Sequence, residues 1–246
     1  MNSAGSPAVC AVVGQGAAFE GQTRTADDTV VFGDGPRALA RAVTDAAERG
    51  PEWLWIVDPC VVPAPDALQE LLVPLASLEA LSAPVLFAGK LVTGPDGRLD
   101  MDSPPWPRLL ARELAMAGAD HHLVALRAAR FGSLLVHRRA VEQHGPPRVD
   151  FAAAGADLEW TGRILRDEPG YLVPRSVALR VAPAAPDPAT FTRERVRILR
   201  GDGWRGQEKA WFAFLLAQDL AQQGAGRPGA APGLLRAVGR GLRAPA

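Results

Sequence analysis

The segment Trp53-Leu54-Trp55-Ile56-Val57 constrains the fold more than any other part of the sequence. Its five apolar residues follow one another without polar alternation, which is typical of a strand that is covered on both faces of a sheet. The run leads directly into Asp58-Pro59-Cys60. It therefore predicts a central strand of an α/β protein, with an acidic residue at the carboxyl end of that strand.

Strand-like and helix-like segments alternate along most of the chain. Further strands are expected at residues 8–13, 29–32, 84–92, 131–136 and 171–181. Helices are expected at residues 36–49, 65–72, 138–144, 157–166, 188–199 and 207–222. This alternation favours an α/β fold with a mostly parallel, Rossmann-like sheet flanked by helices. We expect one domain over residues 1–223 and a flexible tail rich in Gly, Ala, Pro and Arg over residues 224–246, with a short amphipathic piece at 234–242.

Composition narrows the classes of partner. Among 246 residues, 27 Lys and Arg balance 27 Asp and Glu, so no overall field attracts nucleic acid or an acidic membrane. No apolar run approaches the roughly 18 residues of a membrane span, and the N-terminus lacks the basic start of a signal peptide. Cys10 and Cys60 have neither a disulfide framework nor zinc-type spacing. We expect a cytoplasmic protein. Arginines and leucines in the tail leave peripheral contact with the inner membrane face as an alternative to a solvated tail.

Asp58 is the sharpest candidate for a functional residue. Ligands of open α/β sheets bind beyond the carboxyl ends of the strands, where this carboxylate is expected. There it could face a bound phosphate through a divalent cation. The alternative is that Asp58 and Pro59 form a turn that ends the strand, which is a common use of Asp.

Asp157 and Glu159 form the second candidate, at the start of a predicted helix. Asp157 could act as a general base that takes a proton from an acceptor hydroxyl. Acidic residues in a first helical turn also favour the helix dipole and cap free N–H groups, which requires no catalysis. Elsewhere, Trp106 lies in a Pro-rich loop, where it could stack on a sugar ring or serve packing alone.

Several segments in order resemble the family 2 glycosyltransferases, which have the GT-A fold. Residues 53–68 resemble the stretch around the acidic triplet of the family, and residues 87–98 resemble the strand and Pro-Asp-Gly turn that follow. Residues 131–141 and 157–174 are similar to the later strand–helix and to the catalytic helix with its next strand. Within the family, the segments resemble galactofuranosyl- and rhamnosyltransferases in particular. The resemblance covers roughly residues 35 to 181.

The resemblance implies roles for individual residues. Asp157 matches the position of the catalytic base. Asp58, Asp34 and Arg180 are assigned to the side of the nucleotide-sugar donor. Trp106, Glu159 and Trp160 are assigned to the side of the acceptor, a glycan or a lipid-linked sugar.

The chain also departs from the pattern of the family at its metal site. Pro59 and Cys60 replace the other two acids of the triplet, and Arg180 replaces the histidine that usually closes the site. A thiol is a soft ligand, and a permanent cation repels a metal ion, so Mg²⁺ or Mn²⁺ at Asp58 is disfavoured. The same guanidinium could instead bind a pyrophosphate group bidentately.

Two functions follow from these departures. One is a metal-independent, inverting transferase in which Asp157 deprotonates the acceptor and Arg180 stabilises the leaving nucleoside diphosphate. The other is a catalytically inactive relative that keeps the fold and acts beside a protein partner. The retained base favours the first, and the short segment before Asp58 favours the second.

Overall fold

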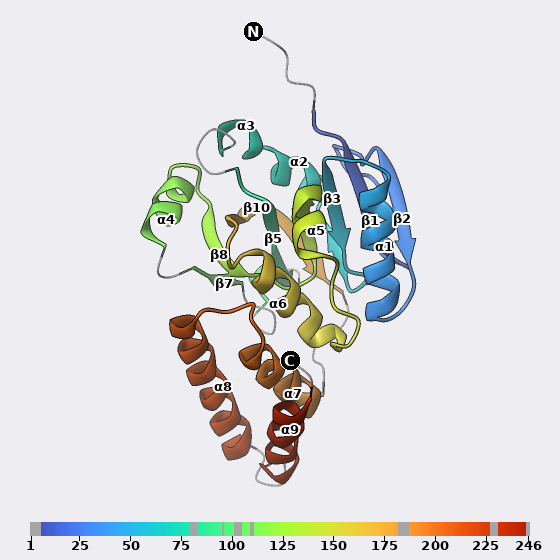
Figure 1. Cartoon of the computed structure of the whole chain (residues 1–246). Helices are drawn as coiled ribbons and strands as arrows, with labels where there is room; N and C mark the ends of the chain where they lie inside the picture. Colours follow the sequence, from blue (N-terminus) through green and yellow to red (C-terminus); the bar gives the residue numbers. More distant parts are fainter. Residues whose placement is uncertain are drawn as a thin grey trace.

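The computed structural model describes residues 6–78, 83–94, 96–100, 105–108, 111–181, 187–226 and 231–244, with the backbone alone at 153–154, 219, 222–226 and 231. Within these ranges the chain forms a ten-stranded sheet with helices on both faces and a helical layer at its C-terminal end (Figure 1).

The main path of the sheet has the order β2-β1-β3-β9-β5-β10-β8-β7. Its strands are β1 (Val9–Gly14), β2 (Asp28–Phe32), β3 (Trp53–Val57), β5 (Leu86–Thr93), β7 (Trp106–Pro107), β8 (Val124–Ala128), β9 (Ser133–His137) and β10 (Gly170–Arg180). Two short strands lie off this path: β4 (Val61–Pro63) pairs with β10, and β6 (Arg98–Leu99) pairs with β5.

Strand direction determines which ends of the strands meet. β1 is parallel to both β2 and β3, and β5 is parallel to β10. β9 runs antiparallel between β3 and β5. The strands β1, β2, β3, β5 and β10 therefore all point the same way, and their carboxyl ends lie along one edge of the sheet. The α/β class is confirmed, with an antiparallel strand inside the sheet.

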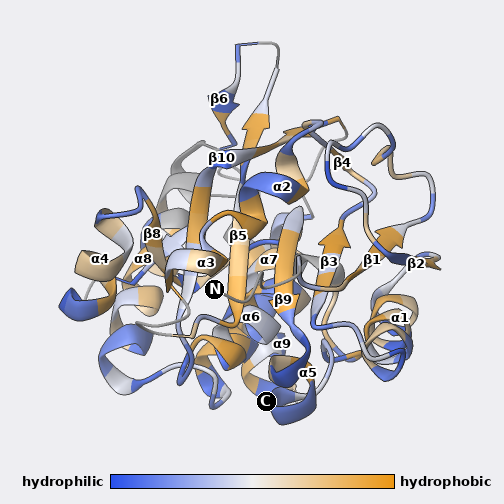
Figure 2. Cartoon of the chain, turned by 90° about the horizontal axis from the view of Figure 1, so that it is seen from above, coloured by the Kyte–Doolittle hydropathy of each residue, from blue (hydrophilic) through white to orange (hydrophobic). Residues whose placement is uncertain are grey.

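The residues of β3 alternate between two cores, one on each face of the sheet. Leu54 and Ile56 face the core covered by α1 (Pro36–Glu48), α5 (Arg138–His144) and α6 (Ala153–Ile164). Trp53, Trp55 and Val57 face the core covered by α2 (Ala67–Leu72) and α3 (Leu75–Leu78). Both sides of β3 are apolar for this reason, and Figure 2 shows the hydrophobic strands between the helices.

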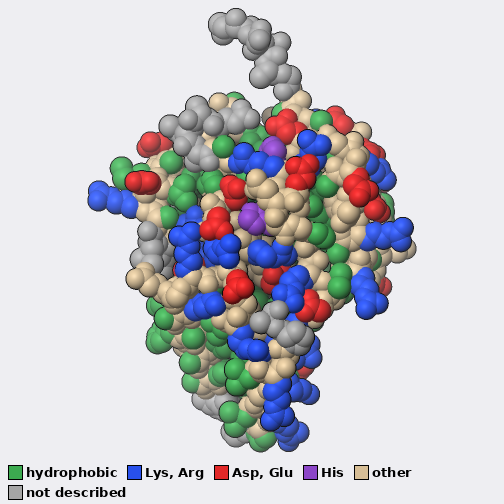
Figure 3. Space-filling model, viewed as in Figure 1, with side chains coloured by type: hydrophobic (Ala, Val, Ile, Leu, Met, Phe, Trp, Pro, Cys, Tyr) green, Lys and Arg blue, Asp and Glu red, His purple; other side chains and the backbone are tan. Residues whose placement is uncertain are grey.

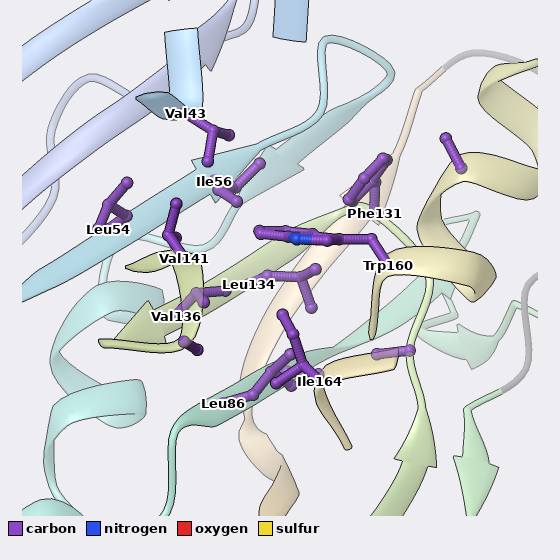
Figure 4. Close-up of a cluster of buried hydrophobic side chains, with 14 of the residues drawn as sticks. Val43, Leu54, Ile56, Leu86, Phe131, Leu134, Val136, Val141, Trp160 and Ile164 are labelled. Carbon is purple, nitrogen blue, oxygen red and sulfur yellow. The ribbon is translucent and has the colours of Figure 1, made fainter. Parts of the chain in front are cut away.

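Trp160 of α6 lies flat over the first of these cores (Figure 4). It is fully buried with Phe131, Leu134 and Ile164 around it, and its indole N–H donates to the carbonyl of Gly145 at 2.8 Å. The side chain anchors α6 to the sheet. It has no exposed surface in this structure, and the acceptor role of Trp160 stays a prediction.

Three helices complete the described chain: α7 (Pro188–Arg200), α8 (Gly206–Gly226) and α9 (Ala231–Arg243). They lie beyond the edge to which the carboxyl end of β3 points (Figure 1). The sequence predicts a flexible tail over residues 224–246, whereas in the structure residues 231–243 form a helix that packs on α7. A Cβ at Gly241 would lie 2.7 Å from Cβ of Val196, so a residue without a side chain permits the close approach.

Most expected strands and helices are present within a few residues of their expected bounds. The sequence interpretation missed the short strands β4, β6 and β7, as well as β8, the short helix α3 and α4 (Arg112–Ala119). Both cysteines are free thiols, Cys10 buried and Cys60 half-buried. Over the described ranges, none of the helices combines the length and the hydropathy of a membrane span.

Candidate functional site

The candidate site lies where β1, β3, β5 and β10 end. A Cβ at Gly14, the last residue of β1, would lie 2.4 Å from Cδ of Pro59. The end of β1 can therefore approach the turn after β3 only because position 14 has no side chain. This contact brings the end of β1 against the Asp58–Cys60 turn.

Asp58 shapes its own turn at this edge. Its Oδ1 accepts a hydrogen bond from the backbone N–H of Cys60 at 2.7 Å, which is the geometry of an Asx turn. Its backbone N–H donates to the carbonyl of Gly132 at 2.9 Å, just before β9. Asp58 therefore forms the strand-ending turn that was one of its two interpretations. Its role in binding the donor stays a prediction.

Asp157 lies on the side of α6 that faces the same edge and is 3% exposed. Arg130 places its Nε 2.6 Å from Oδ2, and the backbone N–H of Leu158 donates to Oδ1 at 2.8 Å. Burial raises the pKa of the Asp157 carboxyl, the positive charge of Arg130 opposes this, and the negative charge of Asp58 adds to it. The two candidate carboxylates therefore lie close enough to influence each other.

Arg180 ends β10 on the other side of the turn. It forms an ion pair with Asp100 at 2.5 Å, and both side chains are nearly buried. β4 pairs Val61 with Arg180, and the next N–H, of Val181, donates to the carbonyl of Cys60 at 2.9 Å. The structure thus brings Asp58, Asp157 and Arg180 to one edge from three separate segments.

The residues around Asp58 do not fit a divalent cation. Asp58 uses one oxygen in its turn, and Asp157 is already paired with Arg130. Burial and the charge of Asp58 raise the pKa of the Cys60 thiol, which keeps it protonated, although Arg180 opposes the shift. Among the described residues, no three or more His, Cys, Asp or Glu are grouped so that they could hold a metal. A hard cation needs several oxygen ligands, which these residues do not supply.

The other predicted residues lie apart from this cluster. Asp34 is exposed in the turn after β2, along the same edge but beyond β1. Trp106 is in β7, at the other end of the strand order from β2, and packs on Trp204 and Phe212 with ring centroids at 5.7 and 4.8 Å. Glu159 lies on the outer side of α6, where Arg163 binds both of its oxygens.

Arg130 is the residue of this site that the sequence interpretation missed. It stands just before the apolar strand, and no sequence spacing links it to Asp157. Its guanidinium carbon lies 5.5 Å from the ring centroid of Phe191 in α7. A cavity of about 20 Å³ beside Arg130 and Lys90 has room for about one water molecule. In the described state, α7 and Arg130 close off Asp157.

The fold is similar to solved structures of TarS from S. aureus. The fragment 1–349 in complex with UDP-GlcNAc matches with a TM-score of 0.56 and 10% identity over 96% of this chain and 81% of that chain. The same fragment in complex with UDP matches with a TM-score of 0.51 and 10% identity, over 89% and 72%. A longer TarS structure matches with a TM-score of 0.51 and 10% identity, and the similarity spans 88% of this chain and 43% of that chain.

No protein-family model and no curated protein sequence matches the chain. At 10% identity, the similarity to TarS shows the fold alone. The chain therefore has the GT-A-type α/β fold that the sequence predicts, and its chemistry has to be argued from its own residues.

Proposed function

We propose that this chain is a glycosyltransferase that moves a sugar from a nucleotide-sugar donor to a glycan or lipid-linked acceptor without a metal ion. The observation that carries the proposal is the convergence of Asp58, Asp157 and Arg180 at the carboxyl ends of β3 and β10. This edge is where open α/β sheets bind their ligands. The structures of TarS with UDP and UDP-GlcNAc support a nucleotide-sugar as the class of donor.

The reaction needs a base for the acceptor and a positive charge for the leaving group. The acceptor oxygen forms a bond to the anomeric carbon while the bond from that carbon to the phosphate oxygen breaks, and Asp157 takes the hydroxyl proton. The nucleoside diphosphate leaves with its charge stabilised by the positive charge of the Arg180 guanidinium, which Asp100 holds at the edge of the sheet. Burial raises the pKa of Asp157, which is the direction that makes a carboxylate a stronger base.

Catalysis in this arrangement requires Arg130 to move. Both oxygens of Asp157 are engaged, and the side chain is almost fully buried. A pyrophosphate group that bound Arg130 would release the carboxylate and supply a second cation for the departing charge. We further propose that the protein works in the cytoplasm, with at most peripheral contact with a membrane.

The alternative is a catalytically inactive relative that binds a partner. The burial of Asp157 against Arg130 favours it specifically, because a carboxylate in a stable buried ion pair is a structural element. Such a protein would transfer no sugar from any donor and would form a stable complex with another protein.

Calorimetric titration with UDP, GDP and dTDP, each with and without Mn²⁺, tests the proposal. We expect one nucleotide to bind equally well with and without the metal, and at least 10-fold more weakly in Arg180→Gln. Arg175→Gln is the matched control, because Arg175 is exposed on the same strand. Thermal unfolding of each variant checks that it is folded. Failure of all three nucleotides to bind would reject the transferase in favour of the inactive relative.

A further inference from the structure

A second pocket lies on the outer side of α6, away from Asp157. It has a volume of about 580 Å³ and is bounded by α5, the segment after it, α6 and α7. Five arginines and a histidine line it: Arg148, Arg163, Arg166, Arg197, Arg200 and His144. Figure 3 shows Lys and Arg side chains gathered across this face, where the sheet domain meets the C-terminal helices. Only two acidic residues, Glu159 and Asp202, share the lining.

Acidic residues hold several of these arginines in place. Glu159 binds Arg163 through two hydrogen bonds, at 2.8 and 3.2 Å. Asp150 binds Arg148 at 3.1 and 3.0 Å and Arg197 at 2.6 Å. Such bidentate pairs fix the planes of the guanidinium groups, so less conformational entropy is lost when a ligand binds them.

Other donors at the pocket have no acceptor in the described part of the chain. Arg163 Nη1 and Arg166 Nη2 form no hydrogen bond there. In Arg200, Nη1 donates to the carbonyls of Gly241 and Ala244, and the other guanidinium nitrogens donate to no described residue. The Nε2 atom of His144 is buried and likewise unpartnered among the described residues. The arginine N–H groups face the open pocket, where a ligand can reach them, whereas a buried and unpartnered atom such as His144 Nε2 is uncommon in proteins.

The pocket is separate from the proposed transferase site. Asp157 and Glu159 are two residues apart on a helix, which places their side chains about 200° apart around its axis. Asp157 accordingly contacts Arg130 on the sheet side, whereas Glu159 lines the pocket on the outer side. A ligand in the pocket would therefore not occupy the proposed donor site.

We propose that this pocket binds phosphate groups of a phosphate-bearing ligand. Guanidinium groups match the geometry of phosphate oxygens in pairs, and three arginines here keep N–H groups that no acceptor among the described residues uses. A neutral sugar would need acceptors as well as donors, and the acidic groups that could accept are mostly held by arginines. The phosphate can come from a soluble ligand or from a lipid headgroup, which share this chemistry.

The first arm of the test uses inorganic pyrophosphate as the probe, titrated calorimetrically without nucleotide. Binding that Arg180→Gln leaves unchanged is assigned to the pocket and not to the proposed donor site. The variant carries Arg166→Gln and Arg200→Gln, which change two partly or fully exposed side chains. The matched control carries Arg37→Gln and Arg41→Gln on α1, both exposed and remote from the pocket. We expect the dissociation constant to rise at least 10-fold in the variant and to stay unchanged in the control, with unaltered thermal unfolding in both.

The second arm measures co-sedimentation with vesicles of phosphatidylglycerol or of phosphatidylcholine. Binding to phosphatidylglycerol that the variant loses identifies a lipid headgroup as the source, whereas binding to pyrophosphate alone identifies a soluble ligand. The proposal is overturned if wild type binds neither probe, or if the variant binds as tightly as wild type. The loss of UDP affinity in Arg180→Gln, measured separately, reports on the transferase site and distinguishes failure of that proposal from failure of this one.

Discussion

The Nε atom of Arg130 lies 2.6 Å from the carboxylate of Asp157, and the two side chains are 9% and 4% exposed. The residues come from two segments, the loop before β9 and the middle of α6, 27 positions apart in the chain. Phe191 of α7 covers the guanidinium from the far side. This ion pair therefore joins the sheet edge, the candidate base and the C-terminal helices at one point.

Removal of Arg130 should destabilise the protein strongly. Arg130→Met leaves a buried carboxylate without its partner, which typically costs about 3–5 kcal/mol. The double variant Arg130→Met with Asp157→Leu removes both charges and should recover most of that loss. Urea unfolding at pH 7 measures the three stabilities, and equal losses for the single and double variants would contradict a buried ion pair.

The same variant should show a pH dependence of known sign. Without Arg130, burial raises the pKa of Asp157 further, so the folded state binds a proton that the unfolded state releases above its ordinary pKa of about 4. Stability of Arg130→Met should therefore fall as the pH rises from about 4 towards neutrality. Unfolding measured across this range checks the slope, with the double variant as the control that lacks the titrating group.

Asp157→Asn tests the proposed base directly. Asn keeps the shape and can accept a hydrogen bond from Arg130, but it cannot take the acceptor proton. Loss of general base catalysis costs about 10²–10⁴-fold in rate, so transfer should fall by at least 100-fold while UDP affinity changes little. The exposed Asp45→Asn on α1 is the control. Unchanged turnover in Asp157→Asn would exclude this residue as the base.

Two glycines of α9 should respond in opposite ways to alanine. At Gly241 a new Cβ would meet the backbone oxygen of Arg193 at 2.8 Å and Cβ of Val196 at 2.7 Å, so Gly241→Ala should cost about 1–3 kcal/mol by overpacking. At Gly239 nothing lies within 4 Å, and Gly239→Ala should stabilise the helix by about 1 kcal/mol. Thermal unfolding compares the two. Similar effects of both substitutions would mean that α9 is not docked on α7.

His144 should make stability depend on pH below neutrality. Burial lowers its pKa from the ordinary 6.5, a shift that Arg163 reinforces and Glu168 opposes. As the pH falls through 6.5, the unfolded state therefore gains a proton that the folded state does not bind, and stability decreases down to the folded pKa. His144→Gln should reduce this loss between pH 6.5 and 5, whereas Gln143→Ala next to it should not. An unaltered slope in His144→Gln would count against the burial of this imidazole.

Much of the architecture could be read from local patterns. The apolar run at residues 53–57 indicated a strand covered on both faces, and the structure places alternate residues of β3 in two separate cores. Helix α1 starts at Pro36 and ends before Gly50, whose φ of 85° suits a glycine past a helix end. These signals are local because hydrophobic spacing and backbone stereochemistry act within a few residues.

Short and edge elements carried weaker signals. Strands β4, β6 and β7 have two or three residues each, too few for a period to show. The segment of α9 reads as a tail because it contains Pro232 and three glycines, which are poor helix formers, yet its apolar side packs against α7, with Leu234 and Ala237 buried. Tertiary burial outweighed weak helix propensity there.

By itself, the sequence determined the class of fold, the central strand and the placement of Asp58 and Arg180 at strand ends, because each follows from periodicity and chain order. Only the tertiary structure decided the partners of the charged groups. It paired Asp157 with Arg130, closed the edge with Phe191, and grouped arginines of α6 and α7 around a second pocket. The physical reason is that ion pairs and pockets depend on distances between segments remote in the chain, which no local pattern encodes.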